Sequence, residues 1–160
     1  MEQAETLRTI AEVATAFAGF SGVVLVLGRR TEREWSYVET ATISLFLFFS
    51  LGVVFFALVP LLVEAAGVPV WRISNGLLGI YHLALIIWVG NGIRGRTDRL
   101  LVPLWPGIAA MTGGFGTVVF NLLVAAGALQ PLLFFAYLVA IVFLLAMAAM
   151  MFAALLFESR

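Results

Sequence analysis

Long runs of apolar residues, separated by short polar segments, make up most of the chain. A run of about 20 apolar residues is long enough to cross the hydrocarbon core of a bilayer as an α-helix. The pattern predicts five such helices, at residues 10–27, 43–63, 73–91, 105–126 and 132–157. The predicted fold is therefore all-α: residues 1–160 form a single transmembrane domain, a polytopic bundle of five helices.

The third run organises the rest of the prediction. It carries no charge between Arg72 and Arg94, and Trp71 and Trp88 lie near its ends. Tryptophan rings prefer the headgroup level of a bilayer, which agrees with a membrane span. The only histidine of the chain, His82, falls at the middle of this run and therefore close to the predicted midplane of the membrane.

The last apolar stretch is too long for one helix, because no charge occurs from Leu100 to Phe157. We expect a turn at residues 126–131, where Gly127 suits a helix end and Pro131 suits the first turn of the next helix.

In the first apolar run, residues 10–27, small residues recur every four positions. Such residues let helix backbones approach closely in lipid. They are Ala14, Ala18 and Gly22 on one line, and Ala11, Thr15 and Gly19 on another.

Composition supports lipid as the surroundings of the chain. Of its residues, 63% are hydrophobic and 11% are charged, and its mean hydropathy is +1.11. Soluble domains have about 25% charged residues. The formal net charge is zero, which argues against a nucleic-acid partner. The expected partners are therefore the lipid bilayer and either further copies of the chain, as a homo-oligomer, or other membrane subunits.

The arginines predict the orientation. The loops after the first and third runs hold most of them, and they would act as headgroup and cytoplasmic anchors: Arg29, Arg30, Arg33, Arg94, Arg96 and Arg99. The opposite side has Arg8 and Arg72. Positive residues favour the cytoplasmic side, so we expect the N-terminus outside and the C-terminus in the cytoplasm. Basic residues that are all arginine, with many Ala and Gly, suggest a bacterial cytoplasmic membrane. Glu2, Glu5 and Glu12 indicate a retained first span rather than a cleaved signal.

Absent residue types exclude several chemistries. The sequence has no cysteine and no lysine, which excludes thiolate metal sites and Schiff-base cofactors. One histidine excludes bis-histidine haem ligation within one chain. The common hydrolase and nucleotide-binding motifs are also missing from the sequence. We therefore expect no cofactor, no metal and no enzymatic activity.

Polar residues inside the predicted third and fourth spans are the main functional candidates. Asn75, Gly79 and His82 follow helical spacing and share one face, and Thr117 and Asn121 lie one turn apart. Ionisable groups within a membrane often mark an ion or proton path. The alternative is that these groups are hydrogen-bonding glue between helices. In either case we expect Thr117 and Asn121 to bond to Asn75 or His82.

Glu12 is the one carboxylate that falls inside a predicted span. It is either a proton or cation site near the outer mouth, or an interfacial acid favoured by the dipole of the first helix. The string Ala11-Glu12-Val13 resembles the opening of the small multidrug-resistance exporters, whose first helix carries an essential glutamate. The remaining pattern of that family is missing, so no site residue is carried over.

Residues 112–116, Thr-Gly-Gly-Phe-Gly, resemble the selectivity-filter pattern Thr-x-Gly-Tyr-Gly of potassium channels, and residues 35–42 look like a pore helix. Only about ten residues separate Gly116 from Gly127, too few for the span that must follow a filter. We therefore expect these glycines to serve close helix packing. Two functions remain: a small ion or proton channel or transporter, or a non-catalytic accessory subunit of a larger membrane complex.

Overall fold

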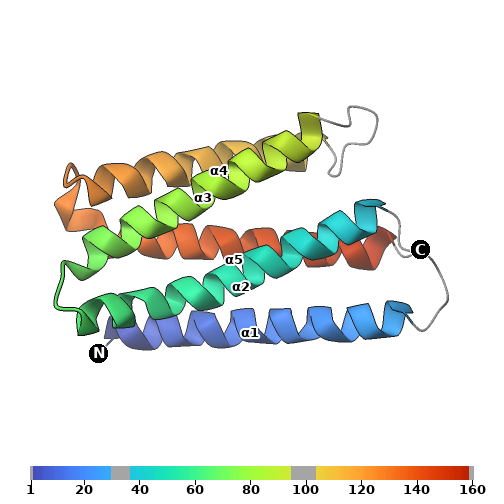
Figure 1. Cartoon of the computed structure of the whole chain (residues 1–160), viewed down its shortest axis with the longest axis horizontal. Coiled ribbons are helices and arrows are strands. Elements are labelled where there is room, and N and C mark those ends of the chain that lie inside the picture. The colour runs from blue at the N-terminus through green and yellow to red at the C-terminus, as the bar shows by residue number, and fades with distance from the viewer. Residues whose placement is uncertain (1, 30–36, 95–103, 159–160) are drawn as a thin grey trace. The chain divides into compact units, whose positions relative to one another are not determined.

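The computed structural model describes residues 2–29, 37–94 and 104–158, and within these the side chains of residues 3–20, 22–23, 40–91 and 110–154. The described residues are entirely helical apart from turns, which confirms the all-α prediction (Figure 1). The elements are α1 (Glu2–Arg29), α2 (Tyr37–Ala65), α3 (Val70–Arg94), α4 (Leu104–Ala125), the 3-10 turn η1 (Gln130–Leu132) and α5 (Leu133–Glu158).

Three helices within the described residues are long and apolar enough to cross a membrane. These stretches are Thr40–Ala65 in α2, Val70–Asn91 in α3 and Gln130–Ala154, which includes α5. A shorter apolar stretch, Ala110–Ala125, lies in α4. The chain therefore has the membrane character that its composition predicts.

The helices α1 and α2 extend beyond the predicted membrane spans. The helix α1 begins at Glu2, two turns before the predicted apolar start at Ile10, because Leu7 already lies in the core and continues the buried side of the helix. The helix α2 begins at Tyr37 and continues past Pro60 to Ala65, two residues beyond the predicted span. The turn after α2 is closed by Gly67, with φ of 68°, whose N–H donates to the Glu64 carbonyl at 3.0 Å.

The chain forms two compact units, and the first consists of Met1–Leu58 with Leu144–Arg160. An aromatic cluster joins three helices within it. The Phe46 and Phe152 rings stack at 5.6 Å, and Phe17 meets them edge-on at 6.3 and 6.1 Å. Such pairs add to the stabilisation that apolar burial provides. This cluster holds α1 against α2 and the last turns of α5.

The small residues of α1 do not all serve close packing as predicted. Ala14 is completely buried, but a Cβ on Gly19 or Gly22 would have no neighbouring atom within 4 Å. Thr15 is exposed, and its hydroxyl donates to the Ala11 carbonyl on the same helix at 2.7 Å. Close helix approach within the chain therefore occurs elsewhere.

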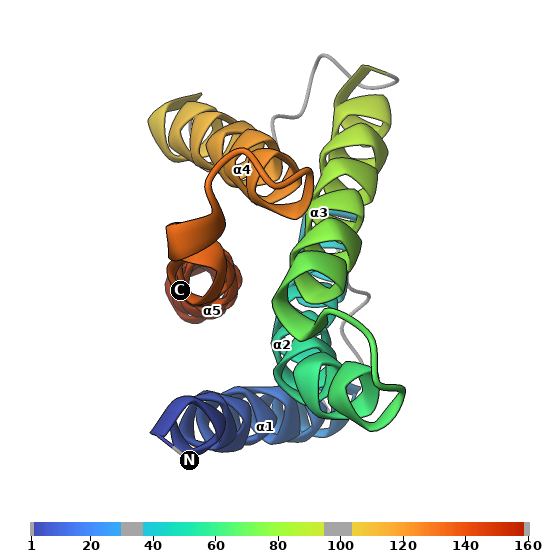
Figure 2. The same ribbon diagram turned by 90° about the vertical axis from the view of Figure 1, so that its left-hand side faces the viewer.

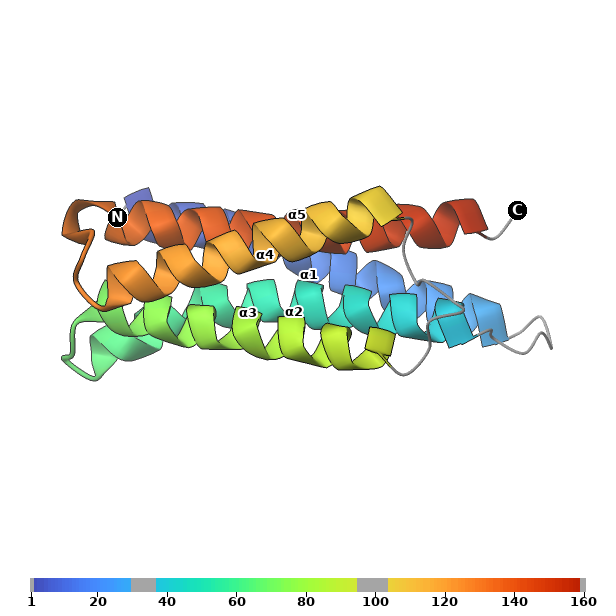
Figure 3. The same cartoon turned by 90° about the horizontal axis from the view of Figure 1, so that it is seen from above.

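The second unit, Val59–Phe143, is built around the antiparallel pair α3 and α4. The two helices run side by side in Figures 1 and 3. A Cβ on Gly79 would lie 3.1 Å from Leu122, and one on Gly114 would lie 3.5 Å from Ile86. Glycines on both helices therefore allow the close packing that small residues provide in membrane proteins.

The turn between α4 and α5 confirms the predicted break (Figure 2). Gly127 has a φ of 92°, and its N–H donates to Val124 at 3.0 Å, while Ala128 donates to Leu123 at 3.0 Å. These two bonds form a Schellman motif, in which glycine adopts the left-handed conformation. Arg72 of α3 donates through Nε to the Ala125 carbonyl at 3.2 Å, where a cation complements the C-terminal end of the helix dipole.

Candidate functional site

Buried polar side chains gather on α3 and α4 within the second unit, and we call them the polar layer. Asn75, Asn121 and Ser74 are completely buried, and His82 and Thr117 are 2% and 7% exposed. Four of these five residues were predicted from the sequence as a transport path. Gly79 lies on the same buried face of α3, and its ideal Cβ would be 3.5 Å from the Cβ of Asn121.

Asn75 joins two helices through its amide nitrogen. The Nδ2 group donates to the Trp71 carbonyl at 2.6 Å and to the Leu133 carbonyl at 2.9 Å. Both acceptors are backbone oxygens, so the amide nitrogen must face them and the amide oxygen must face away. The Oδ1 atom of Asn75 is buried and has no hydrogen-bond donor.

His82 uses one ring nitrogen and leaves the other free. Its Nδ1 lies 2.9 Å from the Leu78 carbonyl oxygen, one turn earlier in α3. A carbonyl can only accept, so the neutral imidazole carries its hydrogen on Nδ1 and a lone pair on Nε2. The Nε2 atom is buried and has no partner in the structure.

The hydrogen bonds of α4 differ from those predicted. The Thr117 hydroxyl donates to the Gly114 carbonyl at 2.7 Å, and Asn121 Nδ2 donates to the Thr117 carbonyl at 2.8 Å. The prediction that these side chains bond to Asn75 or His82 is therefore wrong. Hydroxyl and amide groups within a helix readily bond to carbonyls one turn back, and here such local bonds use the Thr117 hydroxyl hydrogen and one of the two Asn121 amide hydrogens.

The polar layer consequently contains several buried hydrogen-bond acceptors that have no donor. Asn75 Oδ1, Asn121 Oδ1 and His82 Nε2 are all buried without a partner, and so is the Ser74 hydroxyl. Buried polar atoms normally have a hydrogen-bond partner, and leaving one without costs about 1–3 kcal/mol. The unpaired acceptors of the polar layer can bind water or a cation, and His82 Nε2 can also bind a proton.

The ring of Phe143 bounds the polar layer beyond His82. Its centroid lies 6.1 Å from the centroid of the His82 ring, and its Cε2 atom would be 2.7 Å from a Cβ on Gly113. Ile86 packs near Gly114 at the same level. On α3 the described residues after His82 are apolar as far as Gly90. The polar groups therefore extend from the Arg72 end of α3 to His82 and stop at an apolar barrier.

Sequence reasoning missed Ser74 and Phe143. Ser74 directly precedes Asn75, and its helical spacing to the buried Leu78 is the signal that would have found it. Phe143 gives no such signal, because its role depends on the space beside Gly113 on another helix.

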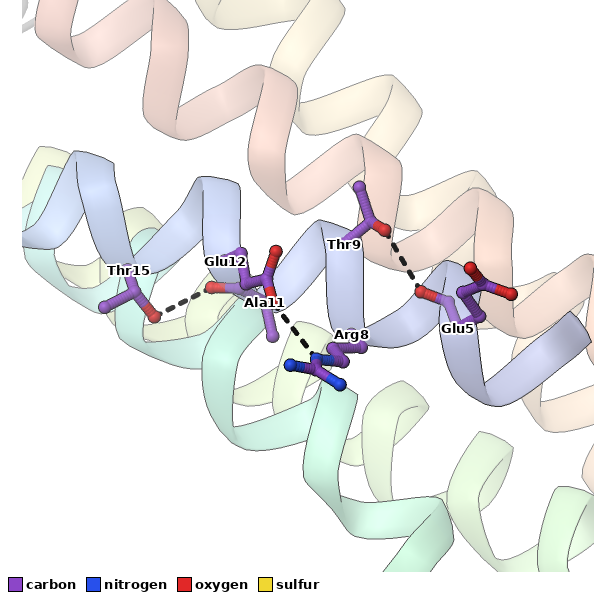
Figure 4. Close-up of polar contacts among 6 residues, drawn as sticks. All are labelled: Glu5, Arg8, Thr9, Ala11, Glu12 and Thr15. Carbon is purple, nitrogen blue, oxygen red and sulfur yellow. Dashed lines mark hydrogen bonds and ion pairs between the residues drawn. The ribbon is translucent and has the colours of Figure 1, made fainter. Parts of the chain in front are cut away.

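Glu12 is not part of the polar layer. It belongs to the first unit and is exposed on α1, where its carboxylate pairs with Arg8 Nε at 3.1 Å (Figure 4). The two residues are one helical turn apart and both are exposed, so the ion pair contributes little to the stability of the protein.

The predicted arginine anchors lie outside the residues whose side chains are described: Arg29, Arg30, Arg33, Arg94, Arg96 and Arg99. Among the described residues, no group of three or more His, Asp or Glu side chains is placed to hold a metal ion. Comparison with protein-family models, with curated proteins and with solved structures finds no match to this chain.

Proposed function

We propose that this chain is a small multi-pass membrane protein that carries protons or small cations along the polar layer of α3 and α4. The observation that carries the proposal is the set of buried acceptors at Asn75, His82 and Asn121, none of which has a donor. Water or a cation that passes between the helices supplies what these atoms lack. Buried polar groups inside a membrane span are a frequent mark of ion and proton pathways.

The proposed topology has five membrane-crossing helices, with the N-terminus outside and the C-terminus in the cytoplasm of a bacterial cell. The shortest helix, α4, has 22 residues, which gives a length of about 33 Å and covers a hydrocarbon core of about 30 Å. The arginine-rich loops after α1 and α3 support this orientation. Glu12 then lies near the outer mouth, where Arg8 balances its charge.

The proposed carrier is a homo-oligomer. The exposed side of α1 supports this, because Gly19 and Gly22 have open space within 4 Å, and Val13, Phe20 and Val23 around them are exposed. A second helix can approach such a surface closely in lipid. Chemical cross-linking in liposomes, with Gly19→Ile as the disrupting variant, tests the assembly.

Transport is tested by ion and proton flux into proteoliposomes. Wild type is compared with His82→Ala, with Glu12→Gln and with Leu83→Ala as a matched control, because Leu83 is 38% exposed and adjoins His82. Flux that is lost in a folded His82→Ala protein, and kept in Leu83→Ala, supports the proposal. Wild-type flux no greater than that of protein-free liposomes, for protons and the common ions, contradicts it.

The second candidate function is that of an accessory subunit in a larger membrane complex. One observation favours it: Asn75 bonds across to Leu133 of α5, beside a cluster in which Trp71 meets the Phe134 and Tyr137 rings at 5.0 and 5.7 Å. In this case the buried polar groups stabilise helix packing through hydrogen bonds and carry no ion. His82→Ala then lowers thermal stability in detergent, no flux is found, and other membrane proteins co-purify with the chain.

A further inference from the structure

The proposed path raises the question of which ion it selects. We propose that the transported ion is the proton and that Nε2 of His82 is the atom that binds it. This inference rests on the proposed transport function and specifies its substrate. The evidence is that the two ring nitrogens differ in hydrogen bonding: Nδ1 is hydrogen-bonded to the Leu78 carbonyl, whereas Nε2 is buried without a partner.

The polar layer disfavours anions. Asn75 Nδ2 donates to two backbone carbonyls, and the Nδ1 hydrogen of His82 and one Nδ2 hydrogen of Asn121 each face another, so few donors are left for an anion. The buried atoms without a partner are two amide oxygens and one imidazole nitrogen, which accept, and the Ser74 hydroxyl, which can donate or accept. Such a site takes a species that donates hydrogen bonds or bears a positive charge.

Among cations, the site favours the proton over sodium or potassium. Alkali ions are bound in channels by rings of oxygen ligands or by carboxylates, which compensate for lost water. The described part of the second unit has a single acid, Glu64, and it is exposed in the last turn of α2. A neutral imidazole nitrogen is a poor ligand for an alkali ion but a good base for a proton.

Within the described part of the second unit, the groups that could add a charge near His82 are few. On α3 itself the titratable groups are Arg72, nearly three turns before His82, Tyr81, and Arg94 at the end of the helix, more than three turns after His82. The described part of α4, residues 110–125, has none, and the part of α5 within the unit contributes Tyr137 alone. The charge that a bound proton adds is therefore borne by the imidazolium, whose Nδ1–H remains bonded to the Leu78 carbonyl.

The proposed step is a simple proton transfer. A hydronium ion loses a proton, one O–H bond breaks, an Nε2–H bond forms on His82, and a water molecule remains. The imidazolium keeps its Nδ1–H bond to the Leu78 carbonyl. In the reverse step Nε2–H returns the proton to water, and no oxidant or reductant takes part.

Two measurements on the full chain in liposomes test this inference. The first follows proton, sodium, potassium and chloride fluxes separately, for wild type, Leu83→Ala and His82→Asn. The asparagine variant can keep a donor toward the Leu78 carbonyl, but it has no Nε2. We expect a proton flux that falls to the level of protein-free liposomes in His82→Asn alone, and no flux of the other ions.

The second measurement uses the fact that the chain has one histidine. Selective 15N-histidine labelling gives one pair of ring signals in a solid-state NMR spectrum. We expect the Nδ1–H tautomer at about pH 8 and protonation of Nε2 as the pH falls toward about 4. An imidazole that keeps one tautomer over this range overturns the inference.

The outcomes separate this inference from the proposed function. A sodium or potassium flux that persists in His82→Asn overturns the proton as substrate but leaves a transport path. An absence of wild-type flux for every ion overturns the transport function and this inference with it.

Discussion

Phe143 approaches Gly113 so closely that a Cβ at position 113 would lie 2.7 Å from the Cε2 atom of the ring. This separation is shorter than side chains adopt, so the ring of α5 occupies the space that the missing methyl group leaves on α4. The contact depends on glycine and fixes the position of the barrier next to His82.

Gly113→Ala should therefore destabilise the protein. The ring has to move, and overpacking of this kind costs about 1–3 kcal/mol. Gly116→Ala is the matched control on the same helix, because a Cβ there has no neighbour within 4 Å. We expect Gly116→Ala to be neutral or stabilising by up to about 1 kcal/mol, since alanine favours helix. Thermal unfolding in detergent measures both, and equal losses would contradict the role of the contact.

Phe143→Ala should raise proton flux, since it removes the apolar barrier that bounds the polar layer beyond His82. Phe135→Ala, two turns earlier in α5 and 56% exposed, is the control and should leave flux at the wild-type level. Flux assays in liposomes at matched protein density compare the two. A Phe143→Ala protein that folds and transports at the wild-type rate would show that the barrier lies elsewhere.

Asn75 and Asn121 should differ in their effect on stability, although both are completely buried. Asn75→Ala removes a bond to Leu133 on another helix, which contributes about 1 kcal/mol. Both variants remove one unpaired amide oxygen, but Asn121→Ala removes only a bond within α4, so its cost should be smaller. Chemical unfolding of the two variants tests the order, and a larger loss for Asn121→Ala would reverse our assignment of the cross-helix bond.

Two glycines with positive φ give a further paired prediction. Gly67→Ala should cost about 1–2 kcal/mol, the usual penalty for a left-handed residue with a side chain. Gly127→Ala should cost more, because its Cβ would lie 3.0 Å from Nη2 of Arg72. The excess should disappear in an Arg72→Ala background, which a double-mutant cycle of unfolding free energies measures. An excess that survives removal of Arg72 would have another cause.

The sequence could predict most of the fold because membrane helices are long and leave a strong apolar pattern. It located the break before α5 correctly, since Gly127 and Pro131 have local reasons to lie there. The apolar run alone does not give the start of α1, because buried residues such as Leu7 precede it. Periodicity also showed that Asn75, Gly79 and His82 share a face.

The chemistry of the site was harder to predict, because it depends on which atoms are already bonded. The sequence identified Thr117 and Asn121 but gave them partners on α3, whereas both bond to carbonyls of their own helix. The free acceptors are what remains after these local bonds, and only coordinates reveal them. The membrane topology and the transported ion remain predictions.

The bond from His82 Nδ1 to the Leu78 carbonyl has a kinetic consequence. A histidine that relays protons through its ring receives on one nitrogen and releases from the other, but here one of the two is held by the backbone. In the proposed transport a proton must therefore enter and leave by Nε2, and the ring or its surroundings must reorient between loading and unloading. Flux should saturate with proton concentration and slow steeply on cooling, as in a carrier that completes one cycle per ion.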